Sequence, residues 1–408
     1  MRPAPAAFFA VALSALVGAL PAAAEAPDPD PRDWPSVLAE AEGQTVHFHA
    51  WAGDPRRNAF IAWAAAEVEA AHRVRVVHVK LADTGEAVAR VVAERAAGRD
   101  AGGAVDLIWI NGPNFAAMKG QGLLFGPWAE DVPNWSFVDV DGKTVQTDFT
   151  VPTEGYEAPW GMAQVVFYHD AARLPDPPRS IAALGDWAAA NPGRFAYPQP
   201  PDFLGATFLK QAAIALVAEP EALQAPVEAA DYDRLTAPLW DWLDALRPNL
   251  WRGGRAYPAT ATQLKQLLAD GEIEIAFSFN QAEASAAIAN GELPDTVRSY
   301  VLEGGTIGNA NFVAIPYNAA AKAGAMVLAN FLMSPAAQLR AQDPAVLGNF
   351  TVLATDRLDP ADRAAFEALD LGIATLSPED LGPALPEPHP SWMERLTRDW
   401  IERYGVSQ

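Results

Sequence analysis

Alternating strands and helices along residues 45–110 limit the fold more than any other feature of the chain. Short runs of apolar residues that favour strands predict strands at 45–50, 74–81 and 105–110. Amphipathic patterns between these runs predict two helices. The first helix has a typical start, because Asp54 supplies an N-cap and Pro55 fits the first helical position. A β-α-β-α-β order calls for a parallel sheet with right-handed crossovers.

The second half of the chain predicts another α/β unit. Strands are predicted at 163–168, 195–197, 273–279 and 311–316, and helices at 180–190, 203–216, 236–250, 260–270, 320–333 and 396–401. The segment 126–158 reads as a long surface connection, because it is rich in proline, glycine and aspartate.

Two α/β units in one chain predict two lobes with a hinged cleft between them. We expect the chain to cross between lobes twice, near 159–165 and 304–312. The predicted division places 25–162 and 305–408 in lobe 1 and 163–304 in lobe 2. Ligands of open α/β sheets bind beyond the carboxyl ends of the strands, so the cleft is the expected site.

The N-terminal residues predict export. Arg2 precedes an apolar stretch at 6–20, and Ala22-Ala23-Ala24 fits the small-residue rule for signal cleavage. We expect a signal peptide at 1–24, cleaved near Ala24, and a periplasmic protein. The chain has no cysteine, which excludes disulfides, thiolate metal sites, cysteine nucleophiles and a lipidated N-terminal cysteine. The formal net charge of -22 makes nucleic acid and anionic membrane surfaces poor partners.

Signals for catalysis are weak. The sequence has no phosphate-binding loop, no dinucleotide fingerprint, no Gly-x-Ser-x-Gly and no His-Glu-x-x-His. His47 and His49 share one face of a predicted strand, which suits either a metal or a half-exposed strand surface. We therefore predict no catalytic residue, no metal and no cofactor.

Signals for ligand binding are stronger. Aromatic, amide and acidic side chains follow predicted strands or lie near the predicted crossings, where an apolar wall with a few fixed polar groups suits a small molecule. The predicted ligand-binding residues are Trp51, Asp54, Asn111, Asn114, Trp160, Gln164, Asp202, Phe203, Asn280 and Asn309. Structural roles remain open for several of them, since both aspartates could cap helices and the asparagines could be turn residues.

Several of these segments resemble the extracellular solute-binding proteins of ABC importers, specifically the YnjB type. The resemblance lies in Gly-Gln-Thr-Val-x-Phe-x-Ala-Trp-x-Gly-Asp-Pro at 43–55, Val-Asp-Leu-Ile-Trp-Ile-Asn-Gly at 105–112, Ala-Pro-Trp-Gly-Met-Ala-Gln at 158–164, Tyr-Pro-Gln-Pro-Pro-Asp-Phe at 197–203, Ile-Gly-Asn-Ala-Asn-Phe-Val at 307–313 and Pro-Glu-Pro-His-Pro-Ser-Trp at 386–392. It implies a two-lobe type II periplasmic binding fold of the class that includes thiamine, polyamine and ferric-iron binders. It also implies delivery of the solute to a permease with a cytoplasmic ATPase, and we expect a monomer.

The solute is less constrained than the family. Ferric-iron relatives usually carry adjacent tyrosines, and this sequence has no Tyr-Tyr pair. The aromatic and acidic residues favour an organic cation, thiamine-like, with Asp54 and Asp202 supplying charge and Trp51, Trp160 and Phe203 supplying ring faces. A sugar or an anion is the alternative within the same fold, because aromatic rings stack on sugars and helix N-termini bind anions. A secreted carboxylate-based hydrolase is the remote alternative.

Overall fold

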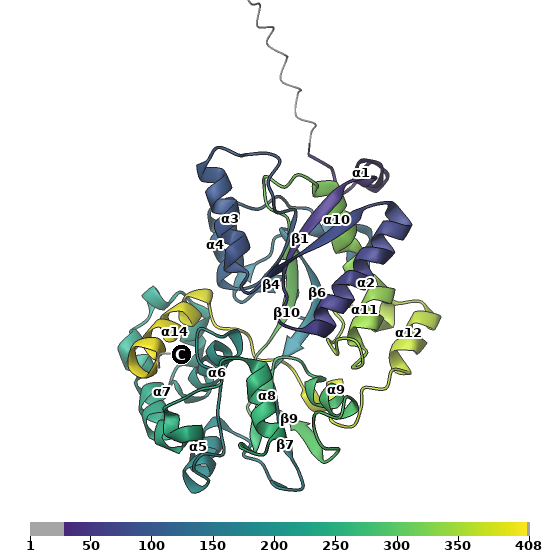
Figure 1. Cartoon of the computed structure of the whole chain (residues 1–408). Helices are drawn as coiled ribbons and strands as arrows, with labels where there is room; N and C mark the ends of the chain where they lie inside the picture. Colours follow the sequence, from purple (N-terminus) through teal and green to yellow (C-terminus); the bar gives the residue numbers. More distant parts are fainter. Residues whose placement is uncertain (1–27, 406–408) are drawn as a thin grey trace, which may run out of the picture.

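The computed structural model describes residues 28–405, arranged as two lobes one above the other (Figure 1). The predicted signal peptide lies outside the described residues. Separate hydrophobic cores support the two lobes. One group of buried side chains surrounds the larger sheet, and the other surrounds the smaller sheet and the C-terminal helix.

The first lobe is built on a mixed sheet of five strands within residues 28–405. Its order is β2 (Arg75–Leu81), β1 (Thr45–Trp51), β3 (Leu107–Ile110), β10 (Gly308–Ala314) and β6 (Glu157–Gln164). Strand β1 is parallel to β2 and β3, which confirms the predicted β-α-β-α-β unit. Strand β10 runs antiparallel to both β3 and β6.

Helices cover both faces of this sheet, as the apolar run of β3 predicts. Helices α1 (Trp34–Ala41), α2 (Pro55–His72) and α10 (Lys322–Leu332) contribute to the core on one face, whereas α3 (Gly85–Ala96) and α4 (Pro113–Gly120) contribute to the core on the other. Helices α11 (Pro335–Gln342) and α12 (Pro360–Glu367) and the short strands β4 (Thr147–Asp148) and β5 (Val151–Pro152) complete the lobe.

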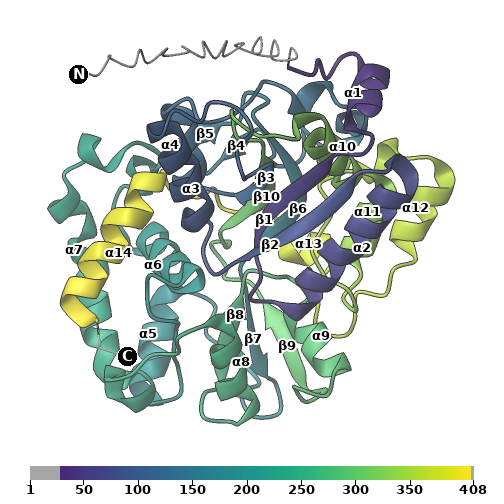
Figure 2. The same cartoon turned by 45° about the horizontal axis from the view of Figure 1, so that its top comes forward.

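The second lobe has a smaller antiparallel sheet in the order β8 (Ile275–Ser278), β7 (Val166–Asp170) and β9 (Val297–Tyr300). Its helices are α5 (Ile181–Ala190), α6 (Phe203–Leu216), α7 (Tyr232–Leu246), α8 (Ala261–Ala269), α9 (Glu283–Ala289) and α14 (Pro390–Tyr404). Figure 2 shows this sheet below the edge of the larger sheet at which β1 ends.

Three segments of the described chain cross between the lobes, where the sequence predicted two. Val165 donates its backbone N–H to Ile307 O at 2.8 Å, which joins the first two crossings. The third runs past α13 (Pro378–Leu381), and its Leu385 donates to Thr306 O at 2.8 Å. The predicted strand 163–168 is therefore two strands, because β6 ends at Gln164 in one sheet and β7 begins in the other.

The C-terminal helix also differs from expectation, since we had placed all of 305–408 in lobe 1. Helix α14 packs in the second lobe, with Trp392, Leu396, Trp400 and Tyr404 buried in that core (Figure 1). The four side chains form one apolar stripe at helical spacing, but spacing does not say which lobe the stripe meets. A smaller prediction was wrong as well, because 195–197 forms only a single bridge at Phe195. Asn114, for which a turn role was left open, lies in the first turn of helix α4.

A buried carboxylate ties the first lobe together. Asp106 is fully enclosed, and its Oδ2 accepts hydrogen bonds from the backbone N and ring Nδ1 of His47 at 2.8 and 2.9 Å. Its Oδ1 accepts from the backbone N–H groups of Ala320 and Ala321, both at 2.9 Å, just before α10. One side chain thus joins β1 to the start of α10.

Replacing Asp106 with asparagine should destabilise this lobe. Asp106→Asn keeps the shape but turns one acceptor into a donor that faces two N–H groups, so we expect a loss of about 2–4 kcal/mol in the free energy of unfolding. Urea denaturation followed by circular dichroism measures this loss. The control is Asp131→Asn, at an exposed position in the same lobe. Equal stability of the two variants would contradict the role given to Asp106.

Candidate functional site

The edge of the larger sheet that faces the second lobe gathers most of the predicted site residues. Strands β1, β3 and β6 end at this edge and β10 begins there, because β10 is antiparallel to its neighbours and Gly308 pairs with Gln164. Trp51, Asn111, Gln164 and Asn309 therefore lie on one edge although they are far apart in sequence. We call it the interlobe edge.

Two aromatic side chains of residues 28–405 remain exposed at the ends of their elements, one in each lobe. Trp51 closes β1 with 38% of its surface exposed, and Phe203 opens α6 with 42% exposed. The Phe203 ring lies 5.7 Å from that of Phe279, which directly follows β8. Exposed rings of this size are the side chains that can stack on a solute.

Trp160 lies elsewhere than we expected. It is 1% exposed and packs in the core of the first lobe, against the rings of Phe60, Phe48 and Trp109. Trp160 was predicted to offer its ring to the solute near a crossing, but Pro159, Trp160 and Gly161 lie inside β6 and are covered on both sides. Its ring therefore supports the sheet instead of lining a surface.

Both predicted acidic residues cap helices. Asp54 accepts from Arg56 N at 2.9 Å at the start of α2, and Asp202 accepts from Leu204 N and Gly205 N at 2.9 and 3.2 Å at the start of α6. Burial raises the pKa of Asp202, while the two backbone N–H groups favour its charged form. Each carboxylate is thus already engaged by a helix.

Three of the predicted amide side chains donate hydrogen bonds to backbone carbonyl groups. Asn111 Nδ2 donates to Ala310 O at 2.6 Å, and Asn280 Nδ2 donates across the lobes to Leu347 O at 2.6 Å. Gln164 Nε2 donates to Thr306 Oγ1 and Leu381 O, both at 3.3 Å, beside the crossings. Asn114 is half-buried in the first turn of α4, and Asn309 joins a buried cluster described below.

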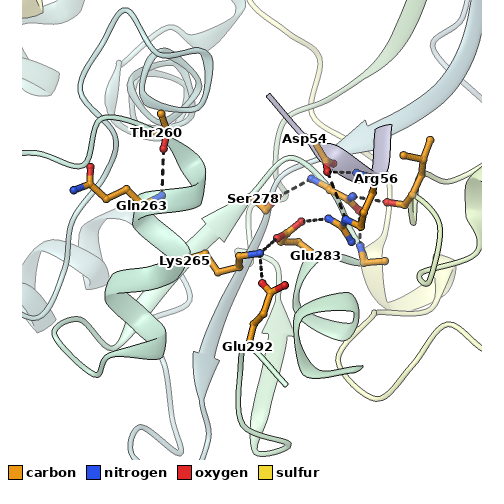
Figure 3. Close-up of polar contacts among 11 residues, drawn as sticks. Asp54, Arg56, Thr260, Gln263, Lys265, Ser278, Glu283 and Glu292 are labelled. Atoms are coloured by element: carbon orange, nitrogen blue, oxygen red, sulfur yellow. Dashed lines mark hydrogen bonds and ion pairs between the residues drawn. The ribbon is translucent and has the colours of Figure 1, made fainter. Parts of the chain in front are cut away.

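An ion-pair network spans the two lobes (Figure 3). Arg56 Nη2 on α2 lies 2.7 Å from Glu283 Oε2 on α9, and Lys265 Nζ on α8 lies 2.9 Å from Glu283 Oε1. Lys265 also contacts Glu292 at 2.6 Å within the second lobe. Although burial opposes the charged form of Glu283, the two cations hold its pKa below the usual value. No sequence pattern indicated this contact, because Arg56 and Glu283 are distant along the chain.

A buried lysine lies where the lobes and the third crossing meet. Lys210 Nζ on α6 contacts Glu387 Oε2 at 2.6 Å, and Asn309 Nδ2 donates to Glu387 Oε1 at 2.9 Å. Its ammonium lies 4.4 Å from the ring of Phe149 in the first lobe and 5.3 Å from that of Phe203. Burial lowers the pKa of Lys210 and raises the pKa of Glu387. We call Lys210, Glu387, Asn309, Phe149 and Phe203 the lysine cluster.

A second buried cation is Arg57, which sequence reasoning missed. It is 8% exposed, and its guanidinium lies over the Trp109 ring at 4.7 Å and near the Trp160 ring at 5.7 Å. Trp51 lies edge-on to Trp109, with ring centroids 6.3 Å apart. The signal was available, because Arg57 stands three and four positions before the buried Phe60 and Ile61 on the apolar stripe of α2.

Neither a metal site nor a membrane-spanning helix is found in residues 28–405. These residues contain no group of three or more His, Asp and Glu side chains placed to hold a metal ion. His47 bonds Asp106, and His49 Nδ1 lies 3.2 Å from His47 O. Within the same range, no helix is long and apolar enough to cross a membrane.

Comparison with known proteins agrees with the two-lobe geometry. The family model for bacterial extracellular solute-binding proteins matches residues 63–359. Protein YnjB of Escherichia coli strain K12 is 44% identical over 374 residues, covering 92% of this chain and 94% of YnjB.

Solved structures show the same fold at low sequence identity. The periplasmic binding protein AfuA from Actinobacillus pleuropneumoniae, solved with exogenous fructose-6-phosphate bound, has a TM-score of 0.60 at 15% identity and covers 89% of this chain and 99% of its own. The Tp0655 (TpPotD) lipoprotein of Treponema pallidum has a TM-score of 0.64 at 14% identity, with 88% and 99% covered. The fold is the type II periplasmic binding fold, and the chain belongs to the bacterial extracellular solute-binding proteins of ABC importers.

Proposed function

We propose that this protein binds a small organic solute between its two lobes, in the periplasm, and delivers it to an ABC permease driven by a cytoplasmic ATPase. The observation that carries the proposal is the pair of exposed rings in different lobes, Trp51 at the interlobe edge and Phe203 at the start of α6. A solute that lies between a ring of each lobe is contacted on both of its faces only when the two lobes approach each other. Binding would then favour the closed arrangement, which is the signal that a permease needs.

The Arg56–Glu283 contact suits a closing motion. It joins α2 to α9 through partly enclosed side chains, while the crossings hold the lobes together through backbone hydrogen bonds. Ion pairs between surfaces can separate without breaking either hydrophobic core. Opening would expose this pair to water, where its attraction is weaker, so the closed state gains stability from it.

The expected organic cation receives less support than we anticipated. Asp54 and Asp202 were to supply its counter-charges, but both cap helices, and Asp54 also lies 3.7 Å from Arg56 Nε. A thiamine-like cation would have to compete with these contacts. The sugar or anion alternative keeps the ring faces and needs neither aspartate.

A secreted carboxylate-based hydrolase gains no support from the buried acids. Asp148 and Glu157 are fully enclosed, and within the described residues both oxygens of Glu157 lack a hydrogen-bond partner. Burial raises the pKa of each carboxyl well above its ordinary value. A raised pKa suits a general acid, but an enclosed carboxyl cannot reach a glycan, so we propose binding and delivery without catalysis.

Removing either exposed ring should weaken solute binding. We expect Trp51→Ala and Phe203→Ala each to lower affinity about tenfold or more, because a stacked ring contributes both buried area and a specific geometry. Native mass spectrometry of freshly purified protein measures how much co-purified solute each variant retains. Ile401→Ala is the control, at an exposed apolar position of α14. Full retention in both ring variants would place the solute elsewhere.

Removing the charge of Glu283 should favour the open arrangement. Glu283→Gln leaves Arg56 and Lys265 without their shared anion, so we expect the closed state to lose about 1–3 kcal/mol. Small-angle scattering should then give a larger radius of gyration than for the wild type. The matched control is Glu292→Gln, which removes a carboxylate that contacts only Lys265 within the second lobe. Identical radii for all three proteins would argue against the ion pair as a closing contact.

A further inference from the structure

Arg57 is a buried cation that lacks the hydrogen bonds such a group needs. Its Nε and Nη1 atoms are enclosed, and neither has a hydrogen-bond partner among residues 28–405. A buried donor without a partner is costly, and the cost is larger for a charged group. Burial accordingly lowers the pKa of Arg57 to about 10, so the guanidinium is still charged at neutral pH.

The surroundings of Arg57 connect it with the space between the lobes. It follows directly on Arg56, which reaches Glu283 of the second lobe, and Asp54, Arg56 and Glu283 are the charges that act on it. Trp109 lies beneath its guanidinium and leads, ring to ring, to the exposed Trp51. One ring, that of Trp109, thus separates the guanidinium from the exposed Trp51, to which solute binding is assigned.

The nearby carboxylates of the described chain leave Arg57 without a direct contact. Asp54 caps α2 and faces Arg56, and Glu283 is held between Arg56 and Lys265, so each of these carboxylates already contacts a group other than Arg57. A guanidinium presents planar N–H pairs that match carboxylate and phosphate oxygens in a two-point contact. An oxyanion is the group that would satisfy both its charge and its free donors.

Stacking on tryptophan does not explain the burial. Arg340 also lies over a tryptophan, at 4.6 Å from the ring of Trp63, yet Arg340 is exposed and keeps its donors in water. The same cation–π attraction is therefore available on this protein without desolvation. Arg57 differs from Arg340 because its Nε and Nη1 atoms are enclosed and have no hydrogen-bond acceptor among residues 28–405.

We propose that Arg57 binds an oxyanion of the solute, a carboxylate or a phosphate, beside the Trp51 and Trp109 rings. This inference rests on the proposed binding of a solute between the lobes and names its chemical class. The rings of Trp109 and Trp160 hold the guanidinium in place, so solute binding requires little further ordering of this donor. Unlike the fully enclosed Asp148 and Glu157, Arg57 keeps 8% of its surface exposed, through which a solute can reach it. Partial enclosure strengthens the contact, because few water molecules compete for the oxyanion.

The first test uses simple anions and solute-free protein, obtained by unfolding in guanidinium chloride and refolding. Phosphate and acetate are titrated separately at constant ionic strength, with sodium chloride as the balancing salt, and tryptophan fluorescence is recorded. We expect a saturable response to at least one of the two anions, and the better anion distinguishes a phosphate from a carboxylate. Arg57→Met should weaken that binding about 30-fold or more, and Arg57→Lys should weaken it less, since it keeps the charge.

The control is Arg340→Met, which removes a stacked but exposed guanidinium and should bind the anion like the wild type. Far-ultraviolet circular dichroism checks that each variant is folded. An equal response in the wild type and Arg57→Met would overturn the assignment, and so would the absence of a saturable response to both anions.

The second test identifies the charge of the natural solute. Solute released from natively purified protein is analysed by mass spectrometry, and a molecule with a carboxylate or phosphate that Arg57→Met fails to retain supports the assignment. A neutral or purely cationic solute that is retained equally by both proteins overturns it but leaves binding between the lobes intact. Retention of the solute in both Trp51→Ala and Phe203→Ala would instead count against the proposed function.

Discussion

The antiparallel pairing of β6 with β10 is the constraint on which the rest of the structure depends. The chain leaves the first lobe from the end of β6 and returns at the start of β10, and these two points are neighbours because Gly308 pairs with Gln164. The third crossing joins them through Leu385. Backbone hydrogen bonds thus connect the lobes along one narrow line, while the surfaces on either side of it meet mainly through side chains. Such an arrangement permits rotation about the line without unfolding either core.

The buried charges fall into two kinds around this line. Lys210 is paired with Glu387, whose other carboxylate oxygen accepts a hydrogen bond from Asn309, so these contacts join the third crossing to both lobes. Arg57 carries the same charge in a similarly enclosed place but has no acceptor among the described residues. Pairing offsets the desolvation cost of a buried cation, whereas an unpaired buried cation lowers stability and is explained best by a ligand that binds to it reversibly. The contrast between these two residues is the physical basis for assigning ligand contact to the second.

Local patterns predicted much of the fold and little of the site. The cap at Asp54 predicted the start of α2, and period-two and period-3.6 patterns predicted β1, β2, α6 and α8 close to their observed bounds. The same patterns did not predict α9 or β9. Sequence order also placed Trp51 and Phe203 at the ends of their elements. Patterns could not predict that Trp160 is enclosed, that α14 joins the second lobe, or that Arg56 meets Glu283, because each depends on contacts between residues far apart in the chain. Arg57 was not among the predicted site residues, although its place on an apolar helix face indicated burial.

The central claim is that a solute binds between the lobes and holds them closed. Since the sequence has no cysteine, Ala66→Cys on α2 and Ala189→Cys on α5 give one unique labelling site in each lobe, both exposed. Distances between spin labels at these positions can be measured by pulsed electron paramagnetic resonance in natively loaded and solute-free protein. Loaded protein should give one narrow distribution, and solute-free protein a longer or broader one. The same distribution in both samples would contradict the account.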